Sequence, residues 1–277
     1  MRVKILLDQE RPKVPHDEVK RVLMAAGVNV TEHGADMGVV VGGDGVFSMF
    51  GRKETIPLLF VGVKSGRPTG SKAYLAAADF EELPSVMAAI VSGKHRIVES
   101  RRLEVFKNGK SLGDVFTDVY LQRGADSNCI RYHLDVKGDS LSISESAISD
   151  GVVVCTRAGS TGYFSYPDKL RDHDTLMADA HTVIAEGQVG ICHILPTYTE
   201  REGATEHPLR YTVPWGSRIE IRIARNVDAR LYGTSMQRTG VKIGRKDRIA
   251  ISASPRTTRV VRLTGVASDL EPRPFTG

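Results

Sequence analysis

The chain has 277 residues, of which 41% are hydrophobic and 26% are charged, a composition typical of a globular protein with one large or two modest cores. No apolar run approaches the roughly 20 residues that cross a bilayer, and the first residues enter an apolar strand pattern rather than a signal sequence. We therefore expect a cytoplasmic protein with no membrane partner. The three cysteines are widely spaced and form no paired motif, which disfavours both a disulfide framework and a zinc site.

The formal net charge is +5, which suits an anionic ligand. The basic residues are nevertheless scattered along the chain, in short pairs such as 101–102 and 245–246. No aromatic residues are interleaved with them, as a surface that stacks nucleic-acid bases would require. We interpret these pairs as solvated surface charge and expect no nucleic-acid partner.

The first hundred residues alternate short apolar strands with helical patterns, which is typical of a mostly parallel sheet covered by helices. A helix over residues 17–26 is favoured by apolar residues at helical spacing, with Pro15 before it and Gly27 after it. A second helix is predicted over residues 83–91. The predicted strands of this region are 3–7, 38–41 and 58–63.

From about residue 97 the pattern changes to short strands separated by hairpin signals, of which Asn108-Gly109 and Gly138-Asp139 are the sharpest. The second half is therefore predicted to be mainly β. Residues 168–186 are a candidate helix, 198–207 are expected to form a polar loop, and the tail after residue 270 is expected to be loosely held. The predicted strands are 102–106, 115–122, 130–136, 141–144, 152–156, 209–213, 218–224 and 248–252.

The strongest local signal is an apolar strand that runs directly into Gly42, Gly43, Asp44 and Gly45. Ligands of an open α/β sheet collect at the carboxyl ends of its strands, and glycines let backbone amides approach phosphate oxygens closely. A carboxylate beside phosphate is repulsive on its own, so Asp44 implies either a divalent metal or a proton to collect from an attacking hydroxyl. Both roles indicate phosphoryl transfer. The alternative is a tight turn in which the aspartate only caps a neighbour.

A second signal begins at Asp150, continues as an apolar strand, and ends in the run of small and polar residues from Ala158 to Tyr163. Small side chains leave room for a flat ligand, and hydroxyl groups can hydrogen bond to it. Glycine, serine and threonine also cluster in ordinary loops, so this segment alone does not decide between a pocket and a connection.

Together, these segments resemble the NAD kinase family, whose Gly-Gly-Asp-Gly loop is followed by an Asn-Glu or Asn-Asp pair and later by Asp-Gly, an apolar strand and Thr-Gly-Ser-Thr-Ala-Tyr. The order and spacing match over roughly residues 38–166. The resemblance implies an N-terminal Rossmann-like open α/β domain over residues 1–98, completed by about 255–277, and a C-terminal β-sandwich domain over residues 99–254, with the ligand cleft between them. Lipid kinases share the glycine loop and the general architecture but lack the segment like 159–163.

The resemblance also implies phosphorylation of the 2′-hydroxyl of the adenosine ribose of NAD, with ATP or another phosphate donor and a divalent metal such as magnesium, in a homodimer or homotetramer. Asp44 would activate the hydroxyl, Asp118 would hold a ribose or adenine edge, and Asp150 would hold the nicotinamide ribose. The pocket would be lined by Ala158, Thr161, Gly162 and Tyr163. Lys64, Arg67 and Arg157 are candidates for phosphate binding because each follows a predicted strand.

Several residues depart from the family pattern. Thr117 stands in place of the asparagine of the pair, Val46 follows the glycine loop where threonine is usual, Arg157 replaces a proline, and Tyr232 stands where aspartate is typical. The segment 64–70 also lacks the family's aromatic residue. These departures alter the acceptor pocket and keep two alternatives open: a kinase with another nucleoside, nucleotide or lipid acceptor, and a catalytically silent nucleotide-binding module.

Overall fold

The structure is a computed structural model that describes residues 1–10, 12–63, 73–125, 127–171, 182–225, 227–234, 239–264 and 273–274. It divides into two compact units. The first, which we call the α/β unit, contains residues 1–100 and 257–270, and the second, which we call the β unit, contains residues 101–256 and 271–277. Among the described residues, every helix is too short or too polar to cross a lipid bilayer.

The α/β unit is built on a parallel sheet in the order β2, β1, β3, β4, and β5 and the end of β19 both pair with β4. Strands β3 and β4 are buried along their whole length, as expected for a parallel sheet that is covered on both faces. Its elements are β1 (Arg2–Leu6), α1 (His16–Ala25), β2 (Asn29–Val30), β3 (Met37–Gly42), α2 (Asp44–Gly51), β4 (Leu58–Gly62), β5 (Ala78–Asp79), η1 (Phe80–Glu82) and α3 (Leu83–Val91).

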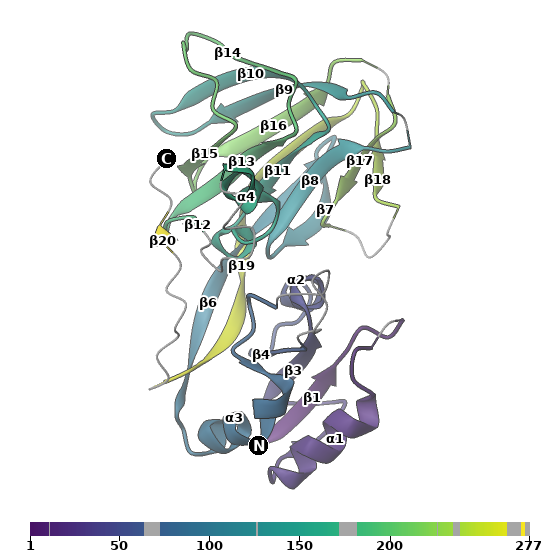
Figure 1. Cartoon of the computed structure of the whole chain (residues 1–277), viewed down its shortest axis with the longest axis vertical. Helices are drawn as coiled ribbons and strands as arrows, with labels where there is room; N and C mark the ends of the chain where they lie inside the picture. Colours follow the sequence, from purple (N-terminus) through teal and green to yellow (C-terminus); the bar gives the residue numbers. More distant parts are fainter. Residues whose placement is uncertain are drawn as a thin grey trace. The chain divides into compact units, whose positions relative to one another are not determined.

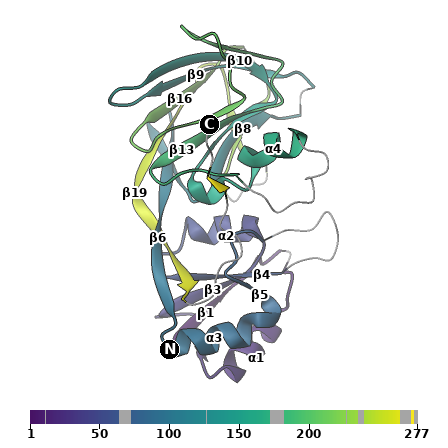
Figure 2. The same cartoon turned by 60° about the vertical axis from the view of Figure 1, so that its left-hand side comes forward.

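Helices α1 and α3 pack together on one face of this sheet, and α2 covers the other face (Figure 2). Leu23 of α1 and Met87 of α3 are fully buried in a core shared with β1, β3 and β4. On the opposite face, the ring of Phe47 in α2 stacks on Phe60 in β4 with centroids 4.8 Å apart. The hydroxyl of Thr258 in β19 donates to the carbonyl of Gly51, the last residue of α2, at 2.5 Å.

The β unit is a sandwich of two sheets whose inner faces share one apolar core (Figure 1). One sheet has the order β14, β10, β9, β16, β19, with β6 and β7 joined to it through β19, and the other has the order β15, β13, β11, β8, β17, β18. Its strands are β6 (His95–Lys107), β7 (Lys110–Val115), β8 (Asp118–Arg123), β9 (Ile130–Lys137), β10 (Ser142–Ser149), β11 (Gly151–Cys155), β13 (Gln188–Ile194), β14 (Tyr198–Arg201), β15 (Arg210–Pro214), β16 (Arg218–Ile223), β17 (Ala229–Tyr232), β18 (Val241–Ile243) and β19 (Arg248–Leu263).

Short helical turns and one small sheet complete this unit. Strand β11 leads into the turn η2, and η3 leads into helix α4, which begins at Tyr166 and ends at Arg171. The carboxylate of Asp168 in α4 forms an ion pair with Arg210 of β15. The remaining elements are η2 (Arg157–Gly159), η3 (Tyr163–Ser165), α4 (Tyr166–Arg171), and the paired strands β12 (Thr182–Val183) and β20 (Arg273–Pro274).

The structure confirms the fold class predicted from the sequence, an open α/β domain with a β-sandwich domain. The hairpin at Asn108-Gly109 is also confirmed, because both residues have left-handed φ angles, 53° and 78°, as a tight hairpin turn requires. The single strand predicted over 115–122 is wrong, since the chain leaves β7 at Val115 and starts β8 at Asp118. The polar loop predicted over 198–207 is wrong in its first part, where β14 pairs with β10.

Candidate functional site

The predicted glycine loop lies where two parallel strands of the α/β unit end. Gly42, the last residue of β3, is in register with Gly62, the last residue of β4. A Cβ atom on Gly42 would lie 3.0 Å from the side chain of Val46, so the first turn of α2 would have to shift slightly to accept a larger residue. Gly43 is the N-cap of α2 in an extended conformation, and Asp44 is the first residue of the helix.

The carboxylate of Asp44 is held by two backbone amides. Its Oδ1 accepts a hydrogen bond from the N–H of Leu75 at 2.9 Å, and its Oδ2 accepts one from the N–H of Tyr74 at 3.1 Å. Because each oxygen accepts from a different backbone N–H, these two bonds fix the direction of the carboxylate. Asp44 is partly exposed, and its side chain therefore combines a fixed direction with access from solvent.

The N-terminal turn of α2 carries the backbone groups that favour an anion. The first N–H groups of a helix have no partner within the helix, and the helix dipole places partial positive charge there. Gly45 lies in this turn and is exposed, and a Cβ atom at this position would meet nothing within 4 Å. The fold itself therefore gives no reason for glycine at position 45, whereas the close approach of a ligand to the backbone would.

One further residue of the α/β unit touches this site, and sequence reasoning missed it. Arg262 of β19 donates from Nη1 to the carbonyl of Leu75 at 3.2 Å, and the N–H of the same Leu75 binds Asp44. Burial, together with the nearby charge of Arg96, lowers the pKa of Arg262 below its usual value. Lys64 and Arg67, the predicted phosphate ligands, lie outside the described residues.

A second group of predicted residues comes together in the β unit, around the start of β8. Thr117 precedes Asp118 there, and its hydroxyl lies 3.3 Å from the Asp118 carboxylate as a hydrogen-bond donor. A Cβ atom on Gly162 would lie 3.0 Å from Asp118 Oδ2. Gly162 thus lets the Ser160–Tyr163 turn pass directly over this carboxylate.

Asp118 is the most perturbed carboxylate of this group. Its desolvation by burial outweighs the hydrogen bond from Thr117 and raises its pKa from 3.8 to about 6. A carboxyl group with this pKa changes charge near neutral pH, which is uncommon for aspartate and typical of binding and catalytic sites. The role that the resemblance implies for Asp118, holding a ribose or adenine edge, stays a prediction.

Three tyrosines stand beside Asp118. Tyr120 packs against Tyr163 edge-on, with ring centroids 5.3 Å apart, and stacks on Tyr232 at 5.2 Å. Burial is the main cause that raises the pKa of Tyr120 to about 12, with the neighbouring Tyr163 and Asp118 adding to it. Tyr163 as a whole residue is 42% exposed. Tyr163 was predicted as a pocket residue, whereas Tyr120 was not singled out and Tyr232 was noted only as a departure from the family.

Two further predicted residues belong to the same turn. Ala158 lies in η2 and Thr161 lies just after it, and both are partly exposed. The buried side chain of Ser160 holds this turn in place: its hydroxyl donates to the carbonyl of Arg157 at 2.7 Å and accepts from the N–H of Ile184 at 3.0 Å. The guanidinium of Arg157 donates to the carbonyl of Ile184 at 3.0 Å, so this side chain has a structural contact.

Asp150 is not part of this group. It precedes β11, whose first residue, Gly151, is opposite Gln122, whereas Cys155 at the other end of β11 is opposite Asp118. Asp150 therefore lies at the far end of the β8–β11 pair from Asp118, about 17 Å away at the usual rise per residue of a strand. Its carboxylate forms an ion pair with Arg123 Nε at 3.0 Å and accepts from the thiol of Cys129 at 3.6 Å.

Chemically, the α/β unit offers an oriented carboxylate beside a helix N-terminus, and the β unit offers a carboxyl group of raised pKa beside an exposed aromatic ring. Within the described residues, no three histidine, cysteine, aspartate or glutamate side chains are grouped as they would be to hold a metal ion. Magnesium is commonly bound by one or two carboxylates together with substrate phosphates, so Asp44 fits such an ion only if a phosphorylated ligand supplies other oxygens.

The chain is similar in sequence and in fold to known kinases of NAD. It is 25% identical over 257 residues to the NAD kinase of Thermoplasma volcanium, covering 92% of this chain and 84% of that protein. It is 31% identical over 173 residues to the NAD kinase of Pseudomonas fluorescens, an alignment that covers 58% of this chain and 55% of that protein. No protein-family profile matches the chain.

Two solved structures share the fold. The crystal structure of yeast NADH kinase with NADH superimposes with a TM-score of 0.68 at 15% identity, covering 97% of this chain and 84% of the yeast chain. The crystal structure of an NAD kinase from Archaeoglobus fulgidus with ATP superimposes with a TM-score of 0.64 at 18% identity, covering 95% and 94% of the two chains.

Proposed function

We propose, from the premise that the chain is a divergent member of the NAD kinase family, that it transfers a phosphoryl group from ATP to the 2′-hydroxyl of the adenosine ribose of NAD and forms NADP. The single observation that carries this proposal is Asp44. It is the first residue of α2, directly after Gly42 and Gly43, and two backbone amides hold its carboxylate.

In this proposal the glycine loop binds the phosphates and Asp44 acts on the acceptor. The amides that follow Gly43 face the anionic part of the ligand, as at other helix N-termini that bind phosphate. The 2′-hydroxyl gives its proton to an Asp44 oxygen while its own oxygen bonds to the γ-phosphorus and ADP leaves. A magnesium ion bound by the phosphates and Asp44 would neutralise negative charge on the transferred group.

The β unit supplies the proposed NAD pocket. Asp118, when ionised, accepts a hydrogen bond from an N–H or O–H of the adenosine, and Thr117 orients it through its hydroxyl. Tyr163 offers an exposed ring for packing against the base. Ala158, Thr161 and Gly162 would line the pocket around these two groups, and Asp150 would contact the nicotinamide ribose at a distance from them. Lys64 and Arg67 remain proposed phosphate ligands.

Three further points complete the proposal. Magnesium as the metal and assembly into a homodimer or homotetramer are supported by the family resemblance, and a cytoplasmic location is proposed from the amino-acid pattern alone. The separation of about 17 Å between Asp150 and Asp118 along one strand pair leaves room for these two residues to contact different parts of an extended dinucleotide.

The experiment that tests this function couples NADP formation to an NADP-specific dehydrogenase. The full chain is incubated with NAD, ATP and magnesium, and Asp44→Asn is the matched control because it keeps the shape of the side chain and removes its charge. NADP formation by the natural chain that falls to background in Asp44→Asn supports the proposal. Equal signals from the two proteins would contradict it.

A thermal-shift measurement with NAD separates the two alternative functions. Ligand at 100 times its dissociation constant stabilises a protein by about 2.7 kcal/mol. Stabilisation by NAD without turnover would indicate a silent nucleotide-binding module. No stabilisation by NAD, together with a shift by another nucleoside, a nucleotide or a lipid head group, would indicate a kinase with a different acceptor, the alternative that Thr117 and the altered segment 64–70 keep open.

A further inference from the structure

The outer face of the β unit carries rows of like charge on strands β9, β16 and β19. Lys137 is directly opposite Arg218 across the β9–β16 ladder, and Asp135 is directly opposite Glu220. The third row contains Arg222, which is opposite His133 on one side and Arg248 on the other. Like charges directly opposite each other destabilise an antiparallel pair, so these rows need compensation from other groups.

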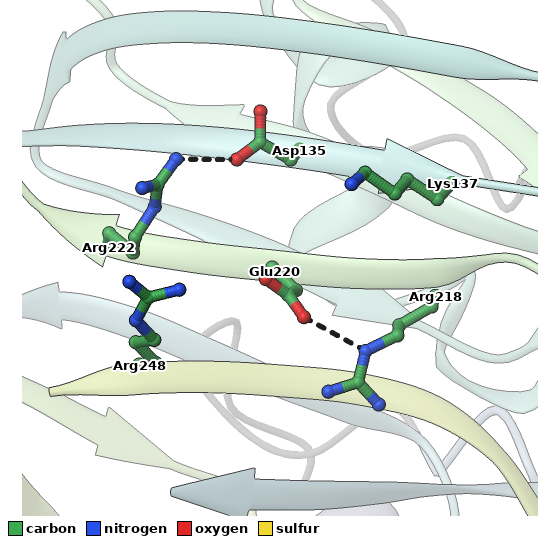
Figure 3. A pocket seen from close by; sticks show the side chains of 6 residues that line it. All are labelled: Asp135, Lys137, Arg218, Glu220, Arg222 and Arg248. Carbon is green, nitrogen blue, oxygen red and sulfur yellow. Dashed lines mark hydrogen bonds and ion pairs between the residues drawn. The ribbon is translucent and has the colours of Figure 1, made fainter. Parts of the chain in front are cut away.

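The acidic row compensates only part of the basic charge. Asp135 accepts from Arg222 at 2.8 Å and from the hydroxyl of Ser144 at 2.9 Å, and Glu220 accepts from Arg218 at 2.9 Å. Figure 3 shows these two ion pairs; the guanidinium of Arg248 points toward the backbone end of Arg222, whose own guanidinium points to Asp135, and no ion pair is drawn to Arg248. The Nε of Arg222 is buried and has no hydrogen-bond partner among the described residues.

Two hollows adjoin this face and share Arg222 and Arg248. The first has a volume of about 190 Å³ and is lined by the six residues in Figure 3. The second has a volume of about 460 Å³, and the basic residues that line it include Arg245 and Lys246. Its one carboxylate, Asp247, is bound by Lys107, Asn108 and the N–H of Gly244.

Four cations around the two hollows therefore have no carboxylate partner within the part of the chain that the structure describes: Lys137, Arg245, Lys246 and Arg248. None of them is needed for an ion pair that stabilises the sandwich. A multivalent anion in the hollows would reduce the electrostatic repulsion between Arg222 and Arg248. It would also contact Lys137 in the first hollow and Arg245 and Lys246 in the second. Guanidinium groups bind phosphate oxygens with two parallel hydrogen bonds.

We propose that this face is a binding site for a small molecule with two or more phosphate groups, bound across Arg222 and Arg248 by residues other than those of the glycine loop. A single phosphate would engage one hollow, whereas an oligophosphate reaches the cations that line both. We call these residues the arginine face: Lys137, Arg218, Arg222, Arg245, Lys246 and Arg248.

Other occupants fit the arginine face less well. Among the described residues, neither hollow is lined by a phenylalanine, tyrosine or tryptophan, and His133 at the second hollow is the one ring on which a base could stack, so a run of several bases would not find successive stacking partners. A second copy of the chain would use the same patch on both sides of a two-fold axis. In a pairing centred on the acidic row, acidic side chains would face acidic ones and basic side chains would face basic ones.

The test is calorimetric titration of the full chain with sodium tripolyphosphate at low salt. Arg248→Ala is compared with Arg131→Ala, which removes an exposed arginine from the same face of β9 that lines neither hollow. The glycine loop is itself expected to bind phosphate, so the comparison of the two variants, and not the total heat, reports on the arginine face. This readout does not depend on kinase activity.

We expect Arg248→Ala to weaken one class of tripolyphosphate sites by about tenfold or more, and the double change Lys246→Ala with Arg248→Ala to remove it. Arg131→Ala should leave that class within about twofold. Without ligand, Arg248→Ala should melt at the same temperature as the natural chain or higher, because it relieves the repulsion with Arg222.

Three results would overturn the proposal. Equal weakening by Arg248→Ala and Arg131→Ala would show general charge attraction only. Unchanged tripolyphosphate binding in Arg248→Ala, with a change of oligomeric state in sedimentation, would assign the arginine face to contact with a second copy. Binding of a single-stranded oligonucleotide that requires Arg248, when tripolyphosphate binding does not, would assign the face to nucleic acid.

Discussion

Leu75 and Asp44 are joined by a 2.9 Å hydrogen bond from the backbone N–H of Leu75 to Oδ1 of Asp44, although 31 residues separate them in the chain. The carbonyl of the same Leu75 accepts a hydrogen bond from Arg262. The orientation of Asp44 therefore depends on the backbone at Leu75, which Arg262 holds from the other side, and not on the glycine loop alone.

Asp44→Asn should affect both rate and stability. If Asp44 takes the proton of the acceptor hydroxyl, its loss lowers kcat by about 10² to 10⁴ while KM for NAD changes little. The amide group of the asparagine would also face the N–H of Tyr74 or Leu75, so one hydrogen bond is lost at a cost of about 1 kcal/mol. Steady-state kinetics and thermal melts check the two effects; a large change in KM with unchanged kcat would contradict the assignment.

Gly45→Ala should stabilise the fold and impair the function. Alanine at an exposed helical position is better than glycine by about 0.5 to 1 kcal/mol, and a Cβ atom here meets nothing within 4 Å. If phosphate oxygens approach this backbone closely, the new methyl group should raise KM for ATP by about tenfold or more. A higher melting temperature with unchanged kinetics would show that the ligand does not approach Gly45.

Asp118→Asn should change how the protein responds to pH. Because burial raises the pKa of Asp118 to about 6, the folded chain binds a proton between about pH 4 and 6 that the unfolded chain has released. Stability contributed by this group is therefore present at low pH and is lost as pH rises to about 6, by up to about 3 kcal/mol. Denaturant unfolding from pH 4 to 8 should show Asp118→Asn gaining stability relative to the natural chain as pH rises.

The same titration should appear in substrate binding. If ionised Asp118 accepts a hydrogen bond from the adenosine, KM for NAD should fall as pH rises through about 6 in the natural chain. In Asp118→Asn this dependence should flatten. A KM profile that is identical in the two proteins would remove Asp118 from the proposed pocket.

Arg201→Ala should destabilise the β unit more than Arg218→Ala. The side chain of Arg201 binds Glu145 at 2.7 Å, where Glu145 is only 4% exposed; Glu145 keeps the hydroxyl of Tyr211, so the loss of Arg201 removes one charged hydrogen-bond partner, at a cost of about 1.5 to 3 kcal/mol. Arg218 pairs with Glu220 at 2.9 Å but is 52% exposed, so its loss should cost no more than about 1 kcal/mol. Denaturant midpoints measure the difference, and equal midpoints would contradict this account.

Residues with strong local signals allowed a large part of the fold to be predicted. Helix α3 and the Asn108-Gly109 hairpin were predicted because capping, periodicity and turn residues act over a few positions. Strand β13 was not predicted, although it is a buried apolar run. Helix α2 was not predicted either, because its glycines have low helix propensity and its stability comes from the packing of Phe47 on Phe60. The secondary-structure propensity of a short segment does not reveal such tertiary contacts.

The candidate site shows the same limit. The sequence identified Asp44, Asp118 and Tyr163 as chemically significant, but their partners are set by strand register and by distant chain segments. Tyr232 comes beside Tyr120 because β17 pairs with β8, and Arg262 reaches Leu75 from a strand nearly two hundred residues away. Similarly, Asp150 and Asp118 lie at opposite ends of the β8–β11 ladder because the two strands pair along their length. The sequence motifs around the two residues do not reveal this separation.

Helix α2 has only eight residues, and both of its ends depend on other segments: Asp44 on the backbone at Tyr74 and Leu75, and Gly51 on Thr258, which follows it by 207 positions. A helix this short does not persist alone in water. During synthesis, Asp44 therefore leaves the ribosome long before the strand that completes its helix has been made. The glycine loop should be among the last parts of the chain to reach its native form, since contacts over such long sequence separations are typically slow to form.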